Sequence, residues 1–382
     1  MLLDFCRRHA PELMLVFFGL IFVVVIFGSP GGEMESFLTA SLDVALFVVL
    51  AMLAYLAEDR HRAFRWAAGI WLLILVGGLA AVAAGFGVIS ILPAEALEAE
   101  EFDPDTADLA MAAEIALLLL GILGAAVASL VGFSRRFREW LARYLPFDPD
   151  SFVHTVALVA ILALTLIPPV SLLVTGVPPY LSPQFIELLT ESGDLFADTV
   201  RVNAYGLFWT IVASFLIAGA CVRRTPREAM ERLGLVRPTG REVVLAVAAA
   251  FALVGAFHFI DPMLAALVSY LGLPVTDTEA VNLLFAGSLT VPGIIVASIA
   301  AGFGEEVSIR GLLQPRFGIL LPAVLFASLH AFQYSWDGLI SVFFAGVVFA
   351  YIRRYSNTTT SAVTHTVYDL VLFALLMAGI SF

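Results

Sequence analysis

Lysine is absent from this 382-residue chain, so all 20 of its basic residues are arginine, against 32 acidic residues and a formal net charge of −12. No basic tract or aromatic platform accompanies the arginines, so we expect no nucleic-acid partner. Cysteine is almost absent as well, because Cys6 and Cys221 are the only two. Two cysteines give no zinc-finger spacing, and we expect no disulfide framework.

Charged residues of either sign are scarce, and much of the sequence consists of long apolar runs. Only 14% of the residues are charged and 61% are hydrophobic, with a mean hydropathy of +0.98. A soluble domain is nearer half apolar and about a quarter charged. We predict an all-α, polytopic helical membrane protein of about eleven transmembrane helices, since many runs reach the roughly 20 residues that cross a hydrocarbon core. The runs lie near residues 13–28, 37–57, 66–92, 109–133, 152–176, 201–222, 242–270, 283–303, 318–335, 338–352 and 358–381, of which 338–352 is the least secure.

The loops between these runs alternate in sign. Arginines follow the second, fourth and sixth runs, whereas the loop 93–108 carries seven carboxylates and no arginine. The positive-inside rule places the arginine-rich loops in the cytoplasm. We therefore expect a multi-pass protein of the cell membrane, surrounded by lipids, with a cytoplasmic amino terminus and a carboxy terminus outside.

A proline- and arginine-rich segment at 223–241 is the clearest internal boundary, and we expect it to be a cytoplasmic loop. It separates six leading helices, residues 1–222, from a carboxy-terminal unit of about five helices, residues 242–382. The leading region carries no motif that indicates a role. The polar groups that bear on function lie in the carboxy-terminal unit.

Ionisable side chains inside a bilayer cost roughly 2.5–3.5 kcal/mol each on insertion scales, and those that persist usually face a protein interior or a water-filled cavity. The first such group is "FGEEVSIRG" at 303–311. On a helix, Glu306 and Arg310 are four residues apart and share a face, with the acid before the base. Glu305 points about 100° away from Glu306. We predict that Glu306 and Arg310 form a structural pair and that Glu305 remains free for chemistry; a solvated helix end is the alternative.

Histidines occur in two further apolar runs. His330 follows Phe326 by four residues, about two turns inside a run that begins near a proline. His365 and Asp369 share a face of the last run at the same four-residue spacing. Packing is the alternative role for His330, and capping or helix pairing for the other two residues. Three separate helices that present polar groups at similar depth favour a common site.

These motifs resemble, in their order, those of the CPBP (Abi) family of intramembrane proteases, whose eukaryotic members are the type II CAAX prenyl endopeptidases. The resemblance covers only the carboxy-terminal unit. It implies that Glu305 and His330 act on the attacking water and that His365 and Asp369 assist. The motifs in this chain are Glu305-Glu306-x-x-x-Arg310, Phe326-x-x-x-His330 and His365-x-x-x-Asp369.

The chain departs from the family's pattern in three places, one of which is "SNTTTSAV" where family members usually have glycine-serine before the last helix. Family members commonly carry bulky residues where this chain has Ser308 and Ile309, and asparagine where it has Asp369. A carboxylate is a poorer neutral hydrogen-bond donor than an amide. This difference weakens the case for an oxyanion-stabilising role at Asp369.

Two forms of peptide hydrolysis fit these residues. Glutamate with histidine can activate a water as general base, while buried donors stabilise the oxyanion. Alternatively, Glu305, His330 and His365 could bind Zn²⁺ and leave water as its fourth ligand. The sequence does not decide between them.

Three classes of function remain. We predict an intramembrane endopeptidase that acts near the cytoplasmic membrane face on a membrane-associated peptide or protein, as in CAAX-like or leader-peptide processing. A catalytically silent scaffold or chaperone of the same family is the second class. A proton-coupled transporter is the third, because intramembrane acids and histidines also build proton relays. The leading helices show neither several midplane charges nor the paired broken helices typical of transporters.

Overall fold

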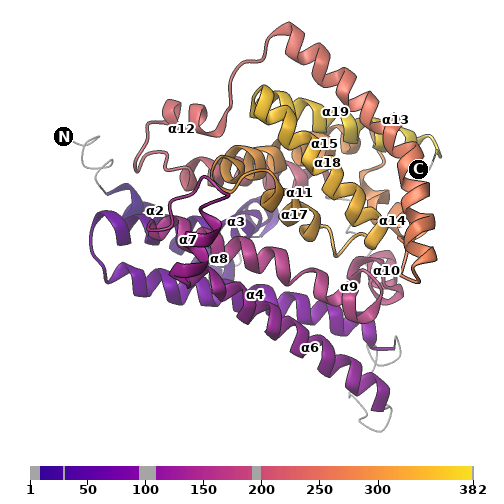
Figure 1. Ribbon diagram of the computed structural model, residues 1–382, viewed down its shortest axis with the longest axis horizontal. Helices are drawn as coiled ribbons and strands as arrows, with labels where there is room; N and C mark the ends of the chain where they lie inside the picture. Colours follow the sequence, from indigo (N-terminus) through magenta and orange to yellow (C-terminus); the bar gives the residue numbers. More distant parts are fainter. Residues whose placement is uncertain (1–8, 29–30, 94–108, 192–198, 381–382) are drawn as a thin grey trace.

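The computed structural model describes residues 9–28, 31–93, 109–191 and 199–380 (Figure 1). All regular structure in this described part is helical, apart from one isolated bridge between Ala220 and Arg224. Ten of its helices are long and apolar enough to cross a membrane. The prediction of an all-α polytopic membrane protein is confirmed.

The ten long helices are built from single α-helices or from α-helices continued by short helical segments. They are α2 (Ala10–Val23) with η1 (Val24–Gly28), α3 (Gly32–Asp59), α4 (Phe64–Ile91), α6 (Leu109–Ser129) with η3 (Leu130–Phe133), α8 (Phe152–Leu166) with α9 (Pro169–Thr175), α11 (Thr199–Ile217), α13 (Gly240–Tyr270), α15 (Val291–Glu305) with η6 (Glu306–Leu313) and α16 (Gln314–Phe317), α18 (Trp336–Tyr355), and α19 (Thr358–Met377). The shorter elements are α7 (Arg135–Leu141), η4 (Pro179–Leu181), α10 (Pro183–Glu191), α12 (Pro226–Leu233), α14 (Thr278–Phe285), η5 (Ala286–Ser288) and α17 (Leu320–Leu329).

Arginine-rich connections meet at one end of the bundle, which we call the arginine end. Arg223, after α11, pairs with Glu58 (2.9 Å) and Asp59 (2.6 Å) at the end of α3. The backbone N–H of Thr358, where α19 begins, donates to the carbonyl oxygen of Gly234 after α12 (3.1 Å). Loops that the charge pattern assigns to one membrane face therefore lie together.

Other described segments between the helices lie at the opposite end, which we call the far end. The Gln184 side chain in α10 donates to the carbonyl oxygen of Leu92 after α4 (2.8 Å). Asp337, at the start of α18, accepts a hydrogen bond from the backbone N–H of Thr276 after α13 (2.9 Å). Successive long helices thus run between the two ends in alternating directions.

The run expected at 318–335 forms only the ten-residue helix α17. Ten helical residues extend about 15 Å, half of a hydrocarbon core of roughly 30 Å. The turn after α17 continues toward the far end, where the carbonyl oxygen of Phe332 accepts a hydrogen bond from the N–H of Tyr180 (2.9 Å). The least secure run, 338–352, is by contrast a full 20-residue helix, α18. In the described residues, the eleven expected runs therefore correspond to ten long helices and the short helix α17.

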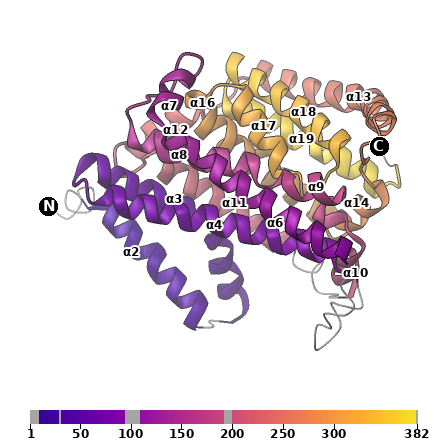
Figure 2. The same cartoon turned by 60° about the horizontal axis from the view of Figure 1, so that its bottom comes forward.

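The carboxy-terminal helices α15, α18 and α19 lie together with α13 beside them, while α3, α4, α6 and α8 form the other side of the molecule (Figures 1 and 2). Helix α11 packs against both α3 and α15 and so joins the two groups. Helices α15 and α19 cross at close range. A Cβ atom on Gly302 would lie 2.1 Å from Oγ1 and 2.5 Å from the backbone nitrogen of Thr366. Small residues permit such close packing in membranes.

Candidate functional site

The site is built around the point where α15 changes into a π-helix. Helix α15 starts after Thr290, whose Oγ1 accepts a hydrogen bond from the N–H of Gly293 (3.1 Å). After Glu305 the backbone widens into the π-helix η6. Such π-helical segments are rare and often mark functional sites. This one carries the second glutamate and the arginine of the sequence motif.

Glu306 and Arg310 are both fully buried, and Oε1 of the glutamate lies 3.6 Å from Nε of the arginine. Ser361 in α19 donates to the other carboxylate oxygen (2.6 Å), and Arg310 donates through Nη2 to the carbonyl oxygen of Gly346 in α18 (3.0 Å). The guanidinium also stacks over the ring of Phe326, 4.5 Å from its centroid. These contacts tie η6 to three neighbouring helices.

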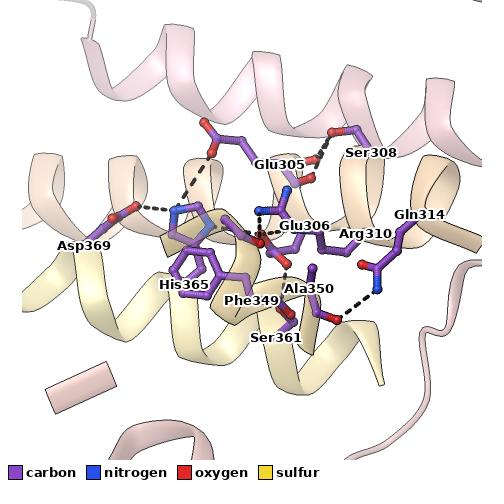
Figure 3. Close-up of polar contacts among 12 residues, drawn as sticks. Glu305, Glu306, Ser308, Arg310, Gln314, Phe349, Ala350, Ser361, His365 and Asp369 are labelled. Carbon is purple, nitrogen blue, oxygen red and sulfur yellow. Dashed lines mark hydrogen bonds and ion pairs between the residues drawn. The ribbon is translucent and has the colours of Figure 1, made fainter. Parts of the chain in front are cut away.

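His365 lies between carboxylates on both sides of its ring (Figure 3). Its Nδ1 is 3.3 Å from Glu306 Oε1, and its Nε2 is 3.4 Å from Asp369 Oδ2 and 3.9 Å from Glu305 Oε2. Only a doubly protonated imidazole can donate a hydrogen to each side. Phe349 stacks on the ring at 4.4 Å between centroids and fixes its plane. The arrangement can hold a positive charge beside Glu305.

Glu305 differs from Glu306 in its exposure. Its side chain is 36% exposed, whereas that of Glu306 is fully buried. Glu305 lines a cleft of about 1120 Å³ whose other walls come from α3 and α11. The cleft extends to Glu33 and Arg201, which form an ion pair near the far end. Glu305 is thus the motif carboxylate that a substrate in this cleft can reach.

His330 stands apart from the other motif residues. Its Nδ1 lies 2.8 Å from the carbonyl oxygen of Phe326. A carbonyl oxygen only accepts, so Nδ1 carries the hydrogen and Nε2 of the neutral ring is an acceptor. The Phe326 ring contacts both histidines, with its centroid 4.8 Å from the ring of His330 and 6.1 Å from that of His365. Within the described residues no hydrogen bond or ion pair joins His330 to Glu305, His365 or Asp369.

The three residues predicted as zinc ligands are not arranged as ligands. Across residues 9–28, 31–93, 109–191 and 199–380, no three histidine, cysteine, aspartate or glutamate residues are grouped so that they could hold a metal ion. Glu305 and Asp369 lie on the Nε2 side of His365, whereas the hydrogen bond that His330 makes runs to the backbone of its own helix. As placed in the described part of the chain, Glu305, His330 and His365 do not form one such group, and no step below uses a metal.

Asp43 is a polar residue that the sequence interpretation missed. It is the twelfth of the 28 residues of α3, and it lines the same cleft as Glu305. In the described part of the chain it makes no hydrogen bond or ion pair. The sequence could have indicated Asp43 as a candidate, because it is the one acidic residue in the apolar run 37–57 and acidic residues are costly in a bilayer.

Fold and site together define a helical membrane protein with a cluster of acidic and basic groups inside its spans, next to a cleft. Residues 287–371 match the family model described as type II CAAX prenyl endopeptidase Rce1-like. The matched segment contains all the motif residues from Glu305 to Asp369, and the resemblance read from the sequence is confirmed. At the level of the family, the match supports an intramembrane protease of the CAAX type. No curated protein and no solved structure matches the chain.

Proposed function

We propose that this protein is an intramembrane endopeptidase in which Glu305 activates the water that attacks a peptide bond. The observation that carries the proposal is the position of Glu305. Its carboxylate lines the cleft and lies 3.9 Å from His365, while the neighbouring Glu306 is buried and engaged with Arg310. One carboxylate is thus available to substrate and the other is structural.

The chemistry follows from general acid–base catalysis. Glu305 takes a proton from the water as the water oxygen attacks the carbonyl carbon of the substrate. The His365 imidazolium stabilises the negative oxygen that develops, and the dry surroundings strengthen this interaction. When the C–N bond breaks, the leaving amine receives the proton from Glu305.

Asp369 and His330 have supporting roles in this proposal. Asp369 lies 3.4 Å from Nε2 of His365 and holds the ring in its orientation. His330 offers its free Nε2 as a further acceptor for the water, because its Nδ1–H is engaged by the backbone. The ring of Phe326 contacts both His330 and His365.

The bond is cleaved in the cytoplasmic half of the membrane in this proposal. His365 is the eighth residue of α19, which begins at the arginine end, so the ring lies about 10 Å along the helix. The positive-inside rule assigns the arginine end to the cytoplasm. Membrane-associated peptides processed in a CAAX-like or leader-peptide manner are the substrates that we propose, and they enter through the cleft between α3, α11 and α15.

The experiment compares the protein termini in membranes of cells that carry the wild type, Glu305→Gln or no copy of the gene. Glu279→Gln is the control, because this carboxylate is exposed on α14 and outside the cleft. We expect membrane-proximal cleavages that require the wild type or the control variant. Identical termini in wild type and Glu305→Gln, together with a phenotype on deletion, would favour the scaffold function. Loss of cleavage with a zinc chelator, and its return with added zinc, would reinstate the metal hypothesis.

A further inference from the structure

A second cavity, separate from the cleft at Glu305, lies at the arginine end of the bundle. Its volume is about 570 Å³, within the range of roughly 300–1,000 Å³ that is typical of ligand pockets. Its walls come from α3, the start of α4, the loop before α8 and the start of α8, the segment from the end of α11 to α12, and the end of η6 with α16. It therefore lies between the leading helices and the carboxy-terminal unit.

The acidic residues that line this cavity are engaged by other groups. The carboxylate of Glu58 accepts a hydrogen bond from the N–H of Val153 at the start of α8 and also pairs with Arg223. Two aspartates of the loop before α8 accept hydrogen bonds or form ion pairs at its rim. Glu58 accepts hydrogen bonds from the N–H of Val153 and the hydroxyl of Ser151 and pairs with Arg223. Asp148 accepts a hydrogen bond from the N–H of Asp150, and the Asp150 carboxylate pairs with Arg135.

Four arginines that line the cavity have no acidic partner in the described part of the chain: Arg65, whose guanidinium lies over the ring of Phe152, and Arg224, Arg232 and Arg316. Arg224 donates only to the carbonyl oxygen of Ala218, and Arg232 only to main-chain carbonyls. Burial and the nearby charges of Arg316 and Arg224 lower the pKa of Arg232 to about 10. Arg232 is still cationic at neutral pH, so its charge and those of Arg224 and Arg316 repel one another.

Arg232 also links the cavity to the candidate active site. Its guanidinium donates to the carbonyl oxygens of Gly311 (3.1 Å) and Leu312 (3.3 Å), both in the π-helix η6 that carries Glu306 and Arg310. A guanidinium has five N–H donors. Arg232 can therefore keep both carbonyl contacts and bind a further acceptor in the cavity.

We propose that this cavity binds a phosphate group through Arg224, Arg232 and Arg316, and that the bound phosphate stabilises the junction between the leading helices and η6. Arginine suits the planar, bidentate recognition of phosphate. The group is either the headgroup of an anionic lipid or a free phosphate ion, since the cavity opens at the end of the spans where headgroups lie. A bound anion relieves the repulsion between the arginines.

The test uses the full chain purified in detergent, with thermal unfolding and native mass spectrometry as readouts. The probes are inorganic phosphate, a short-chain phosphatidic acid and a short-chain phosphatidylcholine. We expect phosphatidic acid or inorganic phosphate to bind and to raise the midpoint of unfolding, because a ligand that binds only the folded state stabilises it. Binding of phosphatidic acid alone identifies a lipid site, and binding of inorganic phosphate identifies a free-anion site.

Two variants and a matched control test whether the anion binds in this cavity. Arg316→Gln removes a cavity charge that makes no hydrogen bond within the described protein, so the fold should survive. Arg232→Gln also removes the link to η6. Each should weaken binding by at least about tenfold, the loss expected for one charge-assisted hydrogen bond. Arg354→Gln, at an exposed position near the end of α18 outside the cavity, should bind as the wild type does. Equal binding by Arg316→Gln and Arg354→Gln, or no binding of either anion, would overturn the proposal.

Discussion

The carboxylate of Glu305 lies 3.9 Å from Nε2 of His365, farther than the 3.4 Å that separates the same nitrogen from Asp369. Asp369 is therefore the closer partner of this nitrogen, and Glu305 is held less tightly. A loosely held, partly exposed carboxylate that lines the cleft can contact a water there and accept its proton. The adjacent Glu306 has the opposite properties, since it is buried and has three partners.

The first prediction separates the roles of the two adjacent glutamates. Glu305→Gln should abolish cleavage and leave the amount of folded protein unchanged, because Glu305 is not part of the buried pair. Glu306→Gln and Arg310→Ala should lower the free energy of unfolding by about 3–5 kcal/mol, since each leaves a buried charge without its partner. Quantification of folded protein in membranes, together with the cleavage assay, checks both parts. Equal levels of all three variants would contradict this division of roles.

Sequence reasoning located the motif residues because four-residue spacing on a helix fixes which side chains share a face. That rule anticipates the contact of Glu306 with Arg310 and the contact of His365 with Asp369. It could not show that Glu305 in α15 and Glu306 in η6 also lie beside His365, because contacts between helices depend on packing and not on local spacing. It also could not show that α17 ends at Leu329, since an apolar run does not reveal where its helix stops.

The second prediction concerns the crossing of α15 and α19. Gly302→Ala places a methyl group against the backbone of Thr366, so the two helices must separate. Overpacking of this kind costs about 1–3 kcal/mol. Because the crossing also holds Glu305 near His365, cleavage should fall together with the unfolding temperature. Gly304→Ala is the matched control on the same helix, since its new methyl group would have only ordinary contacts at 3.7 and 3.8 Å. A Gly302→Ala variant as stable as Gly304→Ala would show that the helices are not packed so closely.

The third prediction concerns membrane orientation. The loops with arginine lie together at one end of the bundle, and the positive-inside rule assigns that end to the cytoplasm. Reporter fusions at Phe382 and within the loop 93–108 should both report a location outside the cytoplasm. A fusion within the loop 223–241 is the control and should report the cytoplasm. A cytoplasmic signal from Phe382 or from the loop 93–108 would show that the orientation is wrong.

The fourth prediction concerns Asp43, the unpaired carboxylate in the middle of α3. A charge at such depth costs roughly 2.5–3.5 kcal/mol on insertion scales, and no partner in the described residues offsets this cost. Asp43→Leu should therefore raise the unfolding temperature. If the carboxylate binds substrate in the cleft that it shares with Glu305, the same variant should cleave several-fold more slowly. Glu33→Leu is the comparison, because Glu33 lines the cleft but is paired with Arg201 and Tyr205, so its loss should give no gain in stability. A gain in stability with unchanged cleavage would mean that Asp43 does not contact the substrate, and a loss of stability would mean that it has a structural partner.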